Sequence, residues 1–148
     1  MITDEMRELI RNHTLAFVAS VDEDGTPNLS PKATMLVLDD KHIGFGHLRS
    51  PNTIRNIEQR PVVELNFIDV FARKGFRFKG PATYEKRGTE RFVSLLPSFA
   101  EWGELRESFL GIVVVRIERA LAVTSPAYDS GATEKDLTAQ WRERYFNL

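Results

Sequence analysis

Short runs of apolar and β-branched residues, separated by tight turn sequences, dominate the pattern of hydrophobic and polar positions along the chain. In one run, Phe76 and Phe78 alternate with basic residues, which is the period of two expected of a half-buried strand. The segment "DEDGTPN" contains Asp24-Gly25, a dipeptide typical of a β-hairpin turn. We therefore predict strands over residues 14–21, 29–38, 42–48, 62–70, 74–85 and 111–125.

Helical patterns are few. Residues 3–12 have an apolar face and begin at Thr3, a suitable N-cap. Further helices are predicted over residues 51–59, 88–102 (with a break or kink at Pro97) and 133–146. Strands joined by tight turns, with few helices between them, indicate a small antiparallel barrel, because a doubly wound parallel sheet needs a helix after nearly every strand.

Composition excludes several classes of protein. The 148 residues suit one domain, and 20 basic against 21 acidic residues leave a formal net charge of −1, which gives no general attraction to nucleic acid or to an anionic membrane. The absence of cysteine excludes disulfides and thiolate catalysis, and the three histidines lack the spacing of a zinc site, so we expect no metal. The charged N-terminus resembles neither a signal peptide nor a membrane span, so we expect a soluble, cytoplasmic protein.

The start of the helix at 51–59 is the first candidate site. Ser50 is a suitable N-cap and Pro51 fits the first helical position, where its missing N–H costs nothing. Asn52 and Thr53 then place side-chain donors beside free backbone N–H groups, and Arg49 adds a cation nearby. Such a helix start favours a phosphate. The alternative is a plain connector between two strands.

The strand at 29–38 is the second candidate. Pro31 cannot donate to a ladder of hydrogen bonds, so the strand is bent or lies at an edge there. Because side chains alternate along a strand, Ser30, Lys32 and Thr34 share one face. Polar side chains followed by the apolar segment "MLVL" are typical of a ligand-binding surface next to the core. The alternative is a strand end that faces solvent.

In the order of its segments, the chain resembles the pyridoxamine 5′-phosphate oxidase-like, FMN-binding split-barrel family. The resemblance covers residues 15–85 and rests on the succession of "AFVASVDEDGTPNLSPKATM", "IGFGHLRSPNTIRNIEQRPVVEL" and "GFRFKGPATY". It implies a mainly β fold, a six-stranded antiparallel split barrel. It also implies a homodimer with two FMN sites at the interface.

The resemblance assigns residues to the flavin. The strand with Ser30, Pro31, Lys32, Ala33 and Thr34 would run beside the isoalloxazine ring. Arg49, Ser50 and the first turn with Asn52 and Thr53 would take the phosphate. Many members carry Arg or Lys in that first turn, so this chain relies on other donors, and a deazaflavin coenzyme is the alternative cofactor.

Other roles are less defined. Lys32 is the candidate cation beside the flavin, where it would ease reduction, or else a solvated lysine. His47 lies at a strand end near the flavin in this interpretation, without a catalytic role. Trp141, on a helix expected to pack at or near the dimer interface, is a candidate wall of the cleft. No catalytic residue is assigned.

Two functional classes remain open. One is an FMN-dependent oxidoreductase acting on an unidentified small molecule, and the other is a flavin-binding carrier or sensor without turnover. Oxidation of pyridoxamine 5′-phosphate itself is not expected, because the C-terminal "WRERYFNL" lacks the Arg- and Pro-rich end of those enzymes.

Overall fold

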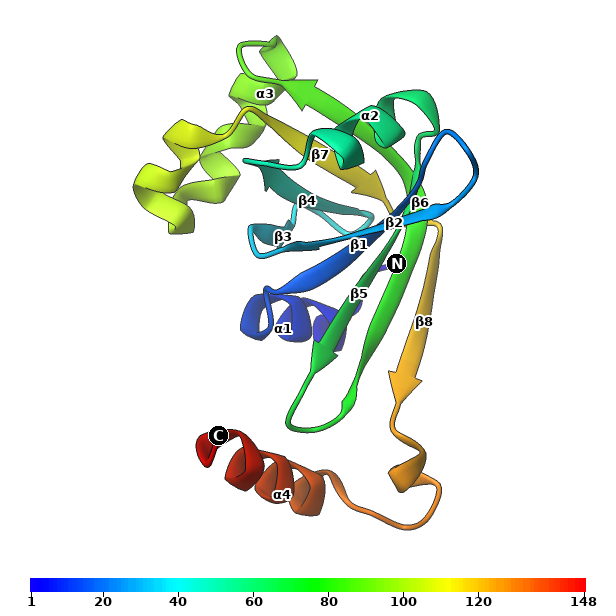
Figure 1. The fold of residues 1–148 in the computed structure, drawn as a ribbon. Coiled ribbons are helices and arrows are strands. Elements are labelled where there is room, and N and C mark those ends of the chain that lie inside the picture. The colour runs from blue at the N-terminus through cyan, green and yellow to red at the C-terminus, as the bar shows by residue number, and fades with distance from the viewer.

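The computed structural model describes all 148 residues and confirms a mainly β, antiparallel fold. A curled sheet forms a split barrel in which the strands follow the order β2-β1-β5-β6-β7-β4-β3, with β8 beside β6 (Figure 1). The strands number eight, not six. They are β1 (Ala16–Val21), β2 (Pro27–Lys32), β3 (Met35–Val37), β4 (His42–His47), β5 (Val62–Asp69), β6 (Lys74–Lys86), β7 (Gly111–Arg116) and β8 (Arg119–Thr124).

Both extra strands come from single predicted runs that the structure divides. The run at 29–38 breaks at residues 33–34, because β2 pairs with β1 whereas β3 pairs with β4 at the other edge of the sheet. The run at 111–125 breaks at residues 117–118, where β7 leaves its pairing with β4 and β8 continues along β6 alone. Hydrophobic pattern does not reveal such changes of partner.

β6 is the strand that holds the barrel together. Its first part pairs with β5 on one side and β8 on the other, and its second part pairs with β7. A Cβ atom on Gly80, at the change of partner, would lie 1.8 Å from the carbonyl oxygen of Arg116, so only glycine allows this close backbone approach.

The helices cover the barrel at different places (Figure 1). They are α1 (Asp4–Asn12), α2 (Pro51–Gln59), α3 (Glu90–Leu95) and α4 (Glu134–Phe146), with 3₁₀ turns at η1 (Leu96–Ser108) and η2 (Pro126–Tyr128). The predicted helix at 88–102 therefore stops being α-helical just before Pro97 and continues as 3₁₀ turns. None of the helices is both long and apolar enough to cross a membrane.

Two apolar cores result. The larger fills the barrel with side chains such as Val18, Leu65 and Phe78, and α2 contributes Ile54 and Ile57 to it. The smaller lies under α3 and η1 and contains residues Phe92, Phe99, Phe109, Ile112 and Val114. The inward side chains of α2 therefore fix that helix on the barrel and hold its N-terminus beside the end of β2.

Candidate functional site

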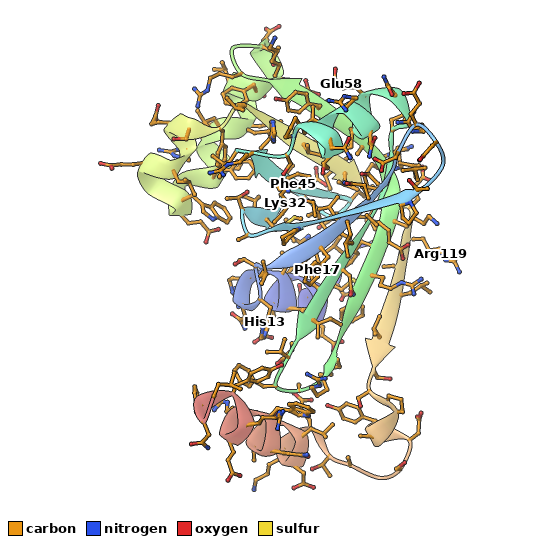
Figure 2. All side chains as sticks on the ribbon, in the orientation of Figure 1. His13, Phe17, Lys32, Phe45, Glu58 and Arg119 are labelled. Atoms are coloured by element: carbon orange, nitrogen blue, oxygen red, sulfur yellow. The ribbon has the colours of Figure 1, made fainter.

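The polar face of β2 is the first part of the site. Ser30, Lys32 and Thr34 are less exposed than the alternating Leu29, Pro31 and Ala33, as predicted for one shared face. Lys32 lies at the end of this edge strand (Figure 2).

The ammonium of Lys32 has three partners. It donates hydrogen bonds to the hydroxyls of Ser30 and Ser50 and to the carbonyl oxygen of Pro31, the last at 3.2 Å. Burial lowers the pKa of Lys32. Lys32 thus joins the edge strand to the start of α2 and is not a freely solvated lysine.

Thr34 is a structural member of this face. Its hydroxyl is buried and donates to the carbonyl oxygen of Gly46 at 3.0 Å, so it fixes the crossing of the chain from β2 to β3. Ala33 and Pro31 are exposed at the edge beside it.

The start of α2 has no side-chain cap, although Ser50 occupies the N-cap position. The Ser50 hydroxyl donates instead to the carbonyl oxygen of Arg49 at 2.6 Å and accepts from Lys32. The backbone N–H groups of Asn52 and Thr53 form no hydrogen bond within the chain. Two oriented donors therefore remain at the positive end of the helix dipole, with Arg49 exposed beside them.

The side chains of Asn52 and Thr53, unlike their backbone N–H groups, already have hydrogen-bond partners. The Asn52 amide donates to Asp22 Oδ1 at 2.9 Å and to Asn28 Oδ1 at 3.0 Å. Thr53 is 1% exposed, and its hydroxyl accepts from the Asn28 amide at 3.4 Å. Both side chains bind the β1–β2 hairpin, so these residues offer only their backbone N–H groups to a ligand.

Asp22 is one of the residues that the sequence analysis missed. Its Oδ1 also accepts from the amide of Asn56, at 2.8 Å, and so ties two turns of α2 to the hairpin. No sequence signal marks this contact, because Asp22 lies in the turn segment, thirty residues before Asn52. The carboxylate is also a negative charge near the first turn, where the local sequence contains none.

His47 ends β4 close to the same helix and is 6% exposed. Its Nδ1 is buried without a hydrogen-bond partner, and its ring meets that of Tyr84 edge to face, with 5.7 Å between the centroids. Burial and the charge of Lys32 lower the pKa of His47. Burial and Glu58, a residue of α2 (Figure 2), raise the pKa of Tyr84.

Trp141 lies apart from the other candidate residues within one chain. Helix α4 is at the opposite end of the molecule from α2, beyond the turn between β5 and β6 (Figure 1). There the guanidinium of Arg73 lies 4.0 Å from the centre of the Trp141 ring, and Tyr145 packs beside Trp141. The structure therefore brings together β2, β4 and α2, but not α4.

The chain is thus a split-barrel protein with a polar cluster between the edge strand β2 and the start of α2. The family model described as pyridoxamine 5′-phosphate oxidase matches residues 2–118, and the chain belongs to this family. No functionally curated protein matches the chain.

Solved structures agree with this assignment. HupZ from Group A Streptococcus is 32% identical with a TM-score of 0.72, covering 84% of this chain and 96% of its own. An FMN-binding protein from Syntrophomonas wolfei is 15% identical with a TM-score of 0.68, covering 84% and 87%. HutZ, the heme storage protein from Vibrio cholerae, is 22% identical with a TM-score of 0.63, covering 83% and 94%. At these two lower identities the likeness concerns the fold alone.

Proposed function

We propose that the protein is an FMN-binding flavoprotein that acts as an oxidoreductase on a small molecule. The observation that carries this proposal is the junction of Lys32 with Ser50, which places a half-buried cation beside two unpartnered N–H groups of α2. An FMN-binding protein among the structures of the same fold also supports it.

The residues present fit a flavin phosphate. The free N–H groups of Asn52 and Thr53 and the positive end of α2 suit an anion, and the first turn contains no acidic residue. Arg49 would add an exposed cation, and Lys32 would hold Ser50 in place. The Asp22 carboxylate would repel the phosphate, but its Oδ1 accepts hydrogen bonds from two side-chain amides, which reduces the repulsion.

A bound flavin supplies the redox chemistry, and the protein contributes orientation and charge. The face of β2 with Ser30 and Lys32 would lie along the ring system, and the Lys32 cation would favour its reduced, negatively charged form. Because Lys32 is half-buried, its charge is screened less than that of a surface lysine.

A homodimer is part of the proposal. Phe17, Leu29 and Leu121 are 43%, 66% and 38% exposed on the outer face of the β2-β1-β5-β6-β8 surface, and Figure 2 labels Phe17 there. Exposed apolar side chains gathered on one sheet face are typical of an interaction site. In a dimer, α4 of one subunit would carry Trp141 towards the cleft of the other.

Light scattering at micromolar concentration checks this assembly. We expect twice the mass of the chain, with a total buried area above about 2,000 Å². A monomer would overturn the proposal, because the cleft then lacks one wall. Contact with nucleic acid or a membrane is not expected, and a cytoplasmic location remains part of the proposal.

The absorbance spectrum of the purified protein, and of the protein titrated with FMN, tests the function directly. Bands of bound FMN support it, whereas a deazaflavin band would select the alternative coenzyme. A heme spectrum, as expected of a protein with the role of HutZ, would overturn it. Reduction of the bound flavin by NADH or NADPH then separates an oxidoreductase from a carrier or sensor.

A further inference from the structure

A cavity of about 540 Å³ lies at the point where β6 changes partner, between its pairing with β8 and its pairing with β7. Its lining includes three cations, Lys79, Arg116 and Arg119, and a single carboxylate, Glu118. None of the residues that line it belongs to β2, β4 or α2. The cavity is therefore separate from the candidate flavin site.

Lys79 and Arg119 are the unusual feature of this cavity. They are directly opposite each other in the ladder between β6 and β8, so both side chains project from the same face of the sheet. Both are exposed, and Figure 2 shows Arg119 pointing away from the barrel. Like charges at opposed positions repel each other and destabilise the sheet. Two cations in this register thus favour an anion that lies between them.

The nearby carboxylates do not neutralise these two cations. Glu64 is opposite Lys79 on β5, but it accepts from Nε of Arg77 at 2.7 Å. Glu118 accepts from the guanidinium of Arg116 at 2.8 Å. The two opposed cations therefore leave two positive charges at the cavity without an ion pair in the chain.

The backbone fixes the positions from which these side chains extend. The N–H of Glu118 donates to the carbonyl oxygen of Lys79 at 3.0 Å. Gly80 allows the backbone of Arg116 to approach β6 so closely that a Cβ atom would not fit. A site on paired strands loses less freedom when a ligand binds than a site on a mobile loop.

We propose that this cluster is a second binding site, which takes a small organic phosphate. Two unneutralised positive charges match a phosphate dianion, and a guanidinium such as that of Arg119 can donate two parallel hydrogen bonds to phosphate oxygens. Val62, which is 41% exposed, and Pro81 line the same cavity and offer apolar surface to the organic part. This site is additional to the flavin site, so the inference does not depend on flavin binding.

Titration calorimetry with phenyl phosphate and with inorganic phosphate tests the inference. Lys79→Gln and Arg119→Gln each remove one of the opposed charges, whereas Arg119→Lys keeps the charge. Lys86→Gln is the matched control, because Lys86 is exposed on the same strand but does not line the cavity. Thermal melting confirms that each variant is folded, and light scattering gives its mass.

We expect phenyl phosphate to bind more tightly than inorganic phosphate. Lys79→Gln and Arg119→Gln should each weaken phenyl phosphate about fivefold, the value of one exposed ion pair. Arg119→Lys should retain most of the affinity, and Lys86→Gln all of it.

Three results would overturn the inference. One is a wild-type protein that binds neither compound, and another is an equal loss in Lys86→Gln, which would reflect general surface charge. The third is a lower mass in Lys79→Gln or Arg119→Gln, because these cations would then contact a second copy of the chain. A protein that binds phenyl phosphate but no flavin would support this site and overturn the proposed function alone.

Discussion

The ammonium of Lys32, at the end of β2, donates a hydrogen bond to the hydroxyl of Ser50, at the start of α2. The two residues are eighteen positions apart, and the contact occupies the hydroxyl that would otherwise cap the helix. An uncapped helix start is costly unless water or a ligand satisfies its N–H groups. The contact thus connects the position of the Lys32 cation to the free N–H groups at the start of α2.

Replacing Lys32 with Met should lower the reduction potential of the bound flavin, because it removes a cation that favours the reduced anion. We expect a change of about 30 mV, which corresponds to roughly 1.4 kcal/mol for a two-electron couple. Spectroscopic redox titration measures it, with Lys41→Met as the control, since Lys41 is exposed in the β3–β4 turn. An unchanged potential in the Lys32 variant would show that this cation does not face the ring.

Replacing Arg49 with Gln should weaken FMN binding by tenfold or more and leave riboflavin binding unchanged. In the proposed complex the exposed guanidinium beside the helix start would interact with the phosphate and not with the ring, and a hydrogen bond to a charged group is worth about 1.5–3 kcal/mol. Arg119→Gln, on β8, controls for general loss of surface charge. Equal losses for both flavins would place the phosphate elsewhere.

Thr53→Val should affect the two flavins alike. The buried hydroxyl accepts a hydrogen bond from the Asn28 amide, so its loss leaves that amide with one acceptor fewer. We expect a decrease of about 1 kcal/mol in the free energy of unfolding and no change in the ratio of FMN to riboflavin affinity. Denaturant unfolding and titration of both flavins measure the two quantities. A loss of affinity for FMN alone would instead show that the Thr53 hydroxyl binds the phosphate.

Local patterns predicted much of the fold. The Asp24-Gly25 turn, the Thr3 cap, the polar face of β2 and the helix that ends before Pro61 all depend on residues close in sequence. Runs of apolar and β-branched residues also indicated every β segment, although two of these runs each contain two strands. They did not predict the breaks at 33–34 and 117–118, because the choice of partner strand depends on the tertiary structure.

The polar network of the site could not be predicted in the same way. Ser50 and Asn52 have the right identity for capping and for binding an anion, but their side chains bind Lys32 and Asp22, which belong to distant segments. Competition among hydrogen-bond partners depends on the tertiary structure. Sequence therefore predicted a polar face on β2 and donors at the start of α2, but not the hydrogen bonds that these side chains form.

The ion pair between Lys74 and Glu134 predicts how pH affects the attachment of α4. The two groups are 2.8 Å apart, and the hydrogen bond to Glu134 raises the pKa of Lys74 above its ordinary value of 10.5. A raised pKa in the folded state stabilises the protein below the ordinary pKa, and this contribution is lost as the pH rises through the folded value.

Glu134→Gln should therefore reduce stability by less than about 1 kcal/mol near pH 8, since the pair is partly exposed. The difference between variant and wild type should decrease as the pH rises above 10.5 and disappear only once the pH exceeds the raised pKa of Lys74. Amide hydrogen exchange in α4, compared with Glu143→Gln on the same helix, measures it. A difference that persists at high pH would mean that the pair does not attach α4.

The change of partner along β6 predicts that Gly80 tolerates no side chain. A Cβ atom there would lie 1.8 Å from the carbonyl oxygen of Arg116, and backbone on both sides is fixed by sheet hydrogen bonds, so the strands must separate to admit it. We expect Gly80→Ala to reduce the free energy of unfolding by about 3 kcal/mol or more.

Gly88→Ala is the matched control, because its φ of 89° is unfavourable for alanine but no atom lies within 4 Å of the new Cβ. That variant should lose only about 1–2 kcal/mol. Denaturant unfolding of both variants gives the two values, and equal losses would show that the contact between β6 and β7 is loose enough to admit a methyl group.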